Sequence, residues 1–357
     1  MLQSYKKMNI NFSQRITFKT KFRQLRIFFS DELKLADRNI AIVRLIRKIP
    51  LARLYPFRTF IPRSWQKFLL FYGNGVGLSG ATLVGNSSTG NSILKLRFRS
   101  ALGVKGTEIE LPKDGAIYEH VRKSGSWETN SSYFLSKTLK KLENKTLSTK
   151  IAFVDLGANS GLVTLQTLRY SQTRNVVLIV EPLPNHVQAI KHNLQTLKTS
   201  SGPVHIFEFA LGRESGVLDI FTETNNNGNS SFLLGAMENS PHSQTKVAIQ
   251  KAEDFFLQYL SDFDYLVIKS DLQGMDAYVL SKIPKDKFER IQSAIVEVWA
   301  LPEINPEDVD KFIDAISFSH NLGWSEKSIG KIQPASVREF WLSKSSLAKD
   351  LYLQKIS

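Results

Sequence analysis

The residues best suited to chemistry begin in the motif VDLGANSG, where Asp155, Gly157, Ala158, Asn159 and Gly161 follow the apolar run IAFVDL. Glycines let the backbone approach a ligand closely, and a strand-to-helix turn delivers backbone N–H groups to the end of the strand. The spacing differs from the GxGxxG run of dinucleotide oxidoreductases, and the GK[ST] ending of a phosphate-binding loop is missing. The turn therefore predicts a site for a nucleoside-containing cofactor. A plain tight β–α turn is the alternative.

A second motif, VVLIVEPLPNH, places an acid where such a cofactor would need one. Glu181 lies 24 residues after Gly157, near the distance at which an acidic side chain accepts hydrogen bonds from a ribose diol. The alternative is a solvated carboxylate at the end of a strand. Five apolar residues before Glu181 and Pro182 after it disfavour that alternative.

Two further carboxylates are candidates for proton transfer. Asp271 and Glu297 lie at the carboxyl ends of the apolar runs YLVIKSD and IQSAIVEVW, the edge at which doubly wound sheets bind ligands. A positioned base contributes ~10²–10⁴-fold to a rate. We expect Asp271 to act as the base with Glu297 supporting it. No metal is expected, because two such carboxylates are more often structural than a metal site. Lys269 is expected to form a local ion pair.

The elements that must position these residues follow a regular pattern from Ile151 onward. Short β-branched runs alternate with helical periods, which is typical of a parallel sheet with crossover helices. The predicted strands are IAFVDL, VVLIVE, VHIFEFA, YLVIKSD and IQSAIVEVW, with VREFWLSK as a final strand. The predicted helices span residues 162–170, 184–197, 252–260, 277–283 and 306–320. Residues 222–250 are too long and polar for a routine connection and predict an active-site loop or a mobile insertion.

The charge of the chain is concentrated at its N-terminus. Residues 1–100 hold 19 Lys and Arg against three acids, whereas the remainder holds 28 basic and 30 acidic residues. An amphipathic helix is predicted within residues 31–48, followed by a proline-punctuated linker and by short strands in ILKLRFRSAL and EIELP. We place a domain boundary near Leu102, with a basic extension, cap and linker over residues 1–101 and the main domain over residues 102–357.

Composition excludes several functions. The chain has no cysteine, so disulfides, thiolate nucleophiles and cysteine-ligated metals are ruled out. Its N-terminus lacks the apolar core of a secretory signal, and no apolar 20-residue span is present. We therefore expect a cytoplasmic protein. The basic segment is either a solvated cap on the main domain or a contact with an anionic membrane surface. Nucleic acid is the less favoured partner, because only this segment suggests it.

Taken together, these motifs resemble the FkbM-type S-adenosylmethionine-dependent methyltransferases. The resemblance covers somewhat over half the chain, in order: SWETNSSYFL, VDLGANSG, VEPLPNHVQAIKHNL, FALG, GNSSF, IKSDLQGMDAYVL and IVEVW. It implies a doubly wound, seven-stranded, Rossmann-like class I methyltransferase sheet. It also implies that residues 155–161 hold the methionine and ribose side of S-adenosyl-L-methionine, that Glu181 holds the ribose hydroxyls, and that Ala210 in FALG belongs to the cofactor site. The acceptor it implies is a small molecule or a glycan, methylated on oxygen.

The chain departs from the pattern of this family at two positions of one motif. Where the family usually has K-x-D-x-E-G-x-E, this sequence has Gln273 in place of the first glutamate and Asp276 in place of the last. An amide is neither a base nor a strong cation ligand. The resemblance thus leaves two hypotheses open: an O-methyltransferase, or a non-catalytic module that binds the cofactor beside an altered substrate site. The glycine spacing disfavours a nicotinamide-dependent oxidoreductase.

Overall fold

The computed structural model describes residues 80–97, 100–113, 115–144, 149–171, 175–197, 202–223, 226–233 and 242–356. The predicted helix within residues 31–48, the linker after it and the proposed membrane contact lie outside these residues. Contacts divide the chain into Met1–Gln66 and Lys67–Ser357, and the fold below is that of the second unit. Within the described part of the chain, no helix combines the length and apolarity needed to cross a membrane.

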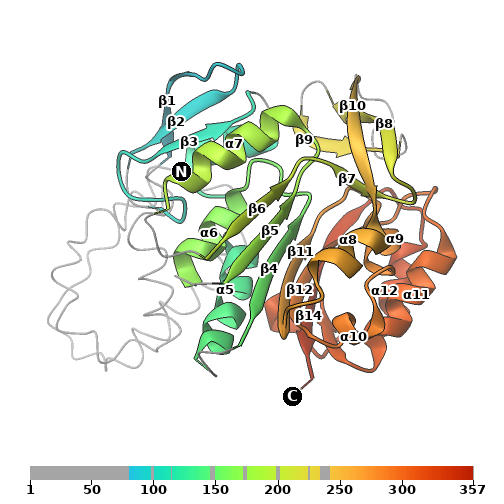
Figure 1. Cartoon of the computed structure of the whole chain (residues 1–357). Helices are drawn as coiled ribbons and strands as arrows, with labels where there is room; N and C mark the ends of the chain where they lie inside the picture. The colour runs from blue at the N-terminus through green and yellow to red at the C-terminus, as the bar shows by residue number, and fades with distance from the viewer. Residues whose placement is uncertain are drawn as a thin grey trace, which may run out of the picture. The chain divides into compact units, whose positions relative to one another are not determined.

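A seven-stranded sheet forms the centre of this unit (Figure 1). From edge to edge its strands are β13 (His320–Gly323), β14 (Ala348–Lys355), β12 (Ile291–Trp299), β11 (Tyr265–Ser270), β4 (Ile151–Leu156), β5 (Val176–Val180) and β6 (Val204–Phe207). Only β14 runs antiparallel to its neighbours. This order, with an antiparallel strand beside one edge, is that of the class I methyltransferase sheet and confirms the predicted fold class.

Helices cover both faces of the sheet, which is why its central strands are mainly apolar, with Asp155 and Lys269 as exceptions near their carboxyl ends. On one face pack α5 (Thr129–Glu143), α6 (Leu162–Ser171) and α7 (Pro184–Gln195). On the other pack α8 (Ala252–Tyr259), α9 (Asp276–Leu280), α10 (Lys285–Phe288), α11 (Pro306–Ser317) and α12 (Pro334–Trp341). Successive side chains of a strand alternate between these faces. Asp155 therefore lies on the same face as Phe153, under α5 and α6.

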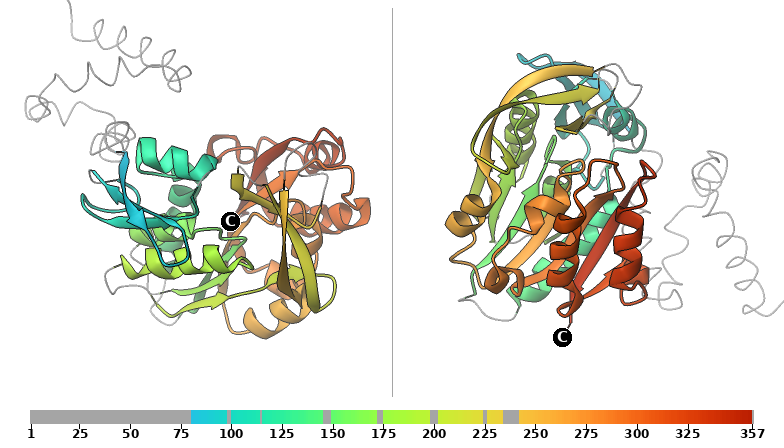
Figure 2. Two further views of the ribbon diagram at one scale, coloured as in Figure 1. Left: turned by 90° about the horizontal axis from the view of Figure 1, so that it is seen from above. Right: turned by 90° about the vertical axis from the view of Figure 1, so that its right-hand side faces the viewer.

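Two smaller sheets lie near the carboxyl ends of the central parallel strands (Figure 2, left). One consists of β1 (Ala81–Asn86), β2 (Ser92–Leu96) and β3 (Glu108–Leu111), with α4 (Ala116–Ser124) beside it. The other has the order β7 (Ala210–Gly212), β10 (His242–Lys251), β8 (Gly216–Glu223) and β9 (Asn226–Ser231). The first sheet is joined to α7 because the Asn193 side chain accepts from the Glu110 backbone N–H at 2.7 Å and donates to its carbonyl at 2.9 Å.

Two sequence-based predictions of local structure were wrong. The segment VREFWLSK lies largely in helix α12, because Pro334 starts the helix and the fully buried Val337 and Trp341 are spaced for one helical face. The final strand is instead β14. Residues 222–250 are not one long loop, because the described part contains β9 and most of β10. Residues 242–249 of β10 pair with β8, and the side chains of Val247 and Ile249 are buried.

Candidate functional site

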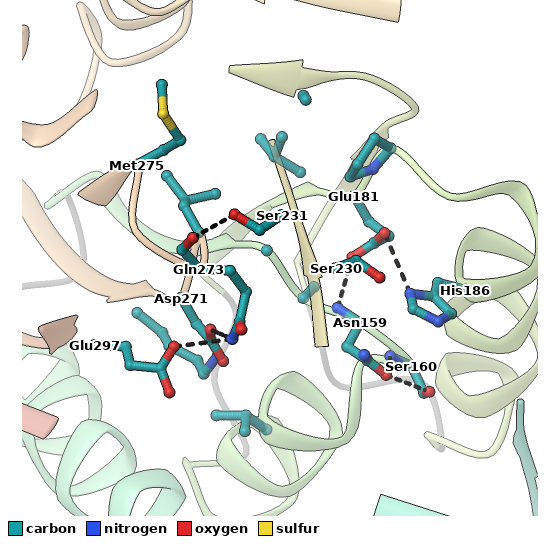
Figure 3. Close-up of a pocket in the computed structure, with 18 of the residues that line it drawn as sticks. Asn159, Ser160, Glu181, His186, Ser230, Ser231, Asp271, Gln273, Met275 and Glu297 are labelled. Carbon is teal, nitrogen blue, oxygen red and sulfur yellow. Dashed lines mark hydrogen bonds and ion pairs between the residues drawn. The ribbon is translucent and has the colours of Figure 1, made fainter. Parts of the chain in front are cut away.

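A cleft lies at the carboxyl edge of the central sheet, with residues of both small-sheet regions in its wall (Figure 3). Most of the sequence-predicted site residues line it: Gly157, Ala158, Asn159, Glu181, Ala210, Asp271 and Glu297. They meet because parallel strands β4, β5, β11 and β12 all end at this edge. The structure does not bring Asp155 or Gly161 to the surface of the cleft.

The turn after β4 depends on its glycines for conformation and for packing. Gly157 and Gly161 adopt left-handed backbone angles, with φ of 74° and 70°, which residues with a Cβ disfavour. A Cβ at Gly157 would lie 2.0 Å from the Asp271 carbonyl oxygen, and one at Gly161 would lie 3.1 Å from the Ile190 side chain. The space freed by these two glycines is therefore filled by the Asp271 loop and by helix α7.

Asp155 stabilises the turn through contacts in the core. Its carboxylate is fully buried and accepts a hydrogen bond from Thr164 on α6, and Lys269 lies opposite it in the sheet register. Burial raises the pKa of Asp155, and the Lys269 ammonium opposes that rise. These contacts tie β4 to α6 and β11, so Asp155 fixes the position of the turn from outside the cleft.

Glu181 is buried, with 4% of its surface exposed, so it is not a solvated strand-end carboxylate. Its Oε2 accepts from the Asn159 backbone N–H at 2.8 Å, and its Oε1 accepts from the Leu183 N–H at 3.0 Å. His186 Nδ1 lies 3.3 Å from Oε1. A carboxylate offers about four acceptor positions. One position on Oε2 therefore remains for a ligand.

Sequence reasoning missed His186. Its side chain lies in the first turn of α7, lines the cleft and is buried, and its Nε2 has no hydrogen-bond partner among the described residues. Buried polar atoms are usually paired, so this nitrogen is a candidate ligand contact. The only signal in the sequence is a histidine five residues after Glu181, which becomes meaningful once α7 is known to begin at Pro184.

A connected group of polar side chains occupies the other end of the cleft. Lys269 Nζ lies 3.1 Å from Asp271 Oδ2, which confirms the predicted ion pair. Gln273 Nε2 donates to Asp271 Oδ1 at 2.7 Å and to Glu297 Oε2 at 2.9 Å. Trp299 Nε1 also donates to Glu297 Oε2, at 2.5 Å. Gln273, one of the two residues that depart from the resembled motif, is thus the link between the two predicted catalytic carboxylates.

Electrostatics separate the two carboxylates. Burial alone would raise the pKa of Asp271, but Lys269, Glu297 and Gln273 together hold that pKa below its ordinary value. Burial, reinforced by the negative charge of Asp271, raises the pKa of Glu297 well above its ordinary value. Burial disfavours the charged form of Lys269, but Asp271 and Glu128 outweigh it and raise the pKa of the ammonium. At neutral pH, Asp271 is therefore ionised and Lys269 is charged, and Glu297 holds a proton more tightly than Asp271 does.

Glu128 is a second residue that sequence reasoning did not assign to the site. It precedes α5 with a left-handed φ of 38°, and its side chain lines the cleft. Burial raises its pKa to about 7, although the nearby Lys269 ammonium opposes the rise. Its motif, SWET, was noted in the sequence, but only the fold shows that the start of α5 faces the end of β11.

The groups in the cleft suit an organic ligand with hydroxyl and amino groups. Among the described residues, no three His, Asp or Glu side chains are grouped so that they could hold a metal ion. Strand β8, strand β9 and the residue after β9 complete the wall with Ile220, Ser230, Ser231 and Phe232. One end therefore offers an acceptor position and apolar surface, and the other an ionised carboxylate, Asp271, beside a carboxyl group of raised pKa, Glu297.

Comparisons with known proteins find only matches of low similarity. No protein-family model matches the chain, and its sequence matches no curated protein. The methyltransferase FkbM from Methylobacillus flagellatus KT aligns with 11% identity over 60% of this chain and 47% of its own, with a TM-score of 0.34. The match thus spans about half the length of that protein. A SAM-dependent methyltransferase from Agrobacterium tumefaciens aligns with 9% identity over 77% and 76% of the two chains, with a TM-score of 0.35.

A third solved structure is similar at the same level. The precorrin-6y C5,15-methyltransferase from Geobacter metallireducens GS-15 has 12% identity, covers 72% of this chain and 100% of its own, and gives a TM-score of 0.33. The fold assignment rests on the strand order described above. The resemblance to the FkbM-type family in particular stays a prediction from the sequence motifs.

Proposed function

We propose that this protein is an S-adenosylmethionine-dependent methyltransferase that methylates a hydroxyl group. The observation that carries the proposal is that one cleft holds the glycine turn after β4, the acid after β5 and the carboxylate after β11. In doubly wound sheets, this edge is where ligands bind. The sugar, glycan or related metabolite suggested as acceptor comes from the motif resemblance alone.

The residues at the β4 and β5 end fit the cofactor. Residues 157–159 would contact its methionine and ribose side, and the remaining acceptor position on Glu181 Oε2 suits a ribose hydroxyl. The unpartnered His186 Nε2 supplies another polar atom there. Pro182, Ala210 and Leu211 add apolar surface suited to an adenine ring. When bound, S-adenosylmethionine supplies an electrophilic methyl group on a sulfonium.

Asp271 is the residue proposed to handle the proton. As the acceptor oxygen bonds to the methyl carbon and the sulfur–carbon bond breaks, the hydroxyl proton passes to the ionised Asp271 carboxylate and then to solvent. The sulfonium charge is lost with that proton, so charge balances. Lys269, fixed 3.1 Å from Asp271, keeps the carboxylate ionised and oriented before the reaction.

Ligand binding tests the cofactor part of the proposal. S-adenosylmethionine and S-adenosylhomocysteine are expected to raise the melting temperature of the protein, and NAD is not. Glu181→Ala should weaken S-adenosylhomocysteine binding by about 1–3 kcal/mol in calorimetry, the scale of a lost charged hydrogen bond. The exposed Glu214→Ala is the matched control. Preferential stabilisation by NAD would contradict the proposal.

Turnover tests the catalytic part. Asp271→Asn keeps the shape of the side chain but removes its basicity, so methyl transfer should fall by about 10²-fold or more while cofactor affinity is retained. Release of S-adenosylhomocysteine in the presence of pooled hydroxylated acceptors is the readout. Cofactor binding without any transfer would instead favour the non-catalytic module. Full activity in Asp271→Asn would remove Asp271 as the base.

A further inference from the structure

The Gln273 amide lies between the two carboxyl groups of the site, as Figure 3 shows. An amide nitrogen carries two hydrogens, and here one is directed at Asp271 and the other at Glu297. Glu297 Oε2 receives a second donor from Trp299 Nε1. Both acceptor positions of Oε2 are thus occupied, which leaves Oε1 of Glu297 as the oxygen open to a proton.

The backbone of Gln273 holds this amide in place. Its φ of 49° lies in the left-handed region, which non-glycine residues rarely adopt. Its carbonyl oxygen accepts from Ser231 Oγ at 2.7 Å, and that hydroxyl oxygen accepts from the Leu233 N–H at 2.9 Å. The next residue, Gly274, is enclosed by the side chains of Leu233 and Leu301. The loop therefore has little freedom to move Gln273 away from the carboxyl pair.

We propose that Gln273 is a positioning residue that joins Asp271 and Glu297 as a pair by donating to both, and that its donation keeps Asp271 ionised and oriented to receive the proton of the acceptor. This inference rests on the proposed function. A glutamate at position 273 would place a third carboxyl group against the first two. The departure from the family pattern is then a working part of this site, and restoring the glutamate is expected to impair it.

Other charged groups surround the pair and are part of its titration. Among the described residues, Lys269 is the only cation that interacts electrostatically with the pair. The acids whose charges interact with Asp271 or Glu297 are Glu128, Asp155, Asp276 and Asp350. Gln273 is the neutral side chain that donates to both members of the pair. Changing it therefore alters the pair without changing any of those charged residues.

The test follows the Asp271 carboxyl directly in the full chain. Asp and Glu side-chain carboxyls are labelled with ¹³C and titrated by NMR, and the Asp271 signal is identified by its loss in Asp271→Asn. Gln273→Met removes the two N–H donors at similar length, and Gln273→Glu adds the third carboxyl. The exposed Gln244→Glu, on β10, controls for a glutamine-to-glutamate change elsewhere.

The expected result is a rise in the pKa of Asp271 by about 1 in Gln273→Met and by more in Gln273→Glu, with Gln244→Glu unchanged. At pH 7 a rise of this size still leaves Asp271 ionised in Gln273→Met, so the expected fall in kcat of about tenfold or more comes from the loss of the donor that orients the carboxylate. S-adenosylhomocysteine affinity should stay within about twofold. Circular dichroism checks that each variant is folded. If only one of the two Gln273 variants folds, its titration alone is enough for the test.

An Asp271 carboxyl that titrates in the Gln273 variants as it does in the wild type would overturn the inference. A gain of turnover in Gln273→Glu would do so as well. The proposed function fails separately, if the wild-type chain binds no S-adenosylmethionine or transfers no methyl group. In that case the NMR titration still decides whether Gln273 holds the pair.

Discussion

Asp276, the other residue that departs from the family pattern, is fully buried beside the site. It accepts from Ser270 Oγ at 2.5 Å and from the Leu272 N–H at 3.1–3.2 Å. Burial nevertheless raises its pKa to about 7, from an ordinary 3.8. Since the folded state binds this proton more tightly than the unfolded state, Asp276 lowers the stability of the fold progressively as pH rises from about 4 to about 7.

Replacing Asp276 by Asn should remove that loss. At pH 4.5 the variant and the wild type should differ little in free energy of unfolding, and at pH 8 the variant should be more stable by about 1–4 kcal/mol. Urea unfolding at the two pH values measures the difference. Other acids with raised pKa, such as Glu128, cancel because both proteins carry them. A constant difference across this range would contradict the prediction.

Sequence reasoning found some site residues and missed others for a physical reason. Glu181 and Asp271 each follow an apolar strand, Glu297 lies near the end of another, and parallel strands bring their carboxyl ends to one edge. Glu128 and His186 belong to the starts of helices, whose approach to that edge depends on packing between elements. The bridging role of Gln273 depends on one side-chain conformation, which no spacing in the sequence specifies.

At the scale of elements, Asn193 joins three parts of the fold. Its side chain exchanges two hydrogen bonds with Glu110 of β3, and its Nδ2 also donates to the Ser160 carbonyl at 2.8 Å. Because Asn193 is fully buried, Asn193→Ala would leave these backbone groups without partners. We expect a loss of about 2–4 kcal/mol in free energy of unfolding. Urea unfolding should show it, and the exposed Asn321→Ala should be near neutral.

The central strands were predictable because they are apolar on both faces, and the crossover helices between them because prolines such as Pro184 and Pro306 begin them. Neither of the two elements that were misread is a strand of the central sheet. Helix α12 is short and rich in residues that also favour strands. Strand β10 exposes most of its first half, so its polar sequence resembles a loop until β8 is known to pair with it.

At the scale of the whole molecule, the boundary near Leu102 stays a prediction that truncation can test. Strands β1 and β2 precede Leu102, and Leu94 and Leu96 are buried against Leu102, Leu162 and Leu165. A chain beginning at Lys67, the start of the larger contact unit, should therefore keep the stability and S-adenosylhomocysteine affinity of the full chain. A chain beginning at Leu102 should lose stability, because this cluster becomes exposed.

Thermal unfolding and calorimetry on both truncated chains provide the measurement. Equal stability of the two would place the boundary at Leu102, as the composition suggests. Failure of the Lys67 chain to bind the ligand, while folded, would assign residues 1–66 a part in the site. The full chain serves as the reference in each case.

The contact between Gly157 and the Asp271 carbonyl also bears on how such a site can change over evolutionary time. It is made by main-chain atoms, so it constrains the path of the β11 loop and leaves the side chains of that loop free to vary. Substitutions at positions such as 273 or 276 can then accumulate without displacing the turn that faces them. Substitution of Gly157 cannot be accommodated in this way, because a side chain there would displace the backbone of the β11 loop. The chemistry of this edge can therefore diverge on a backbone whose course is fixed.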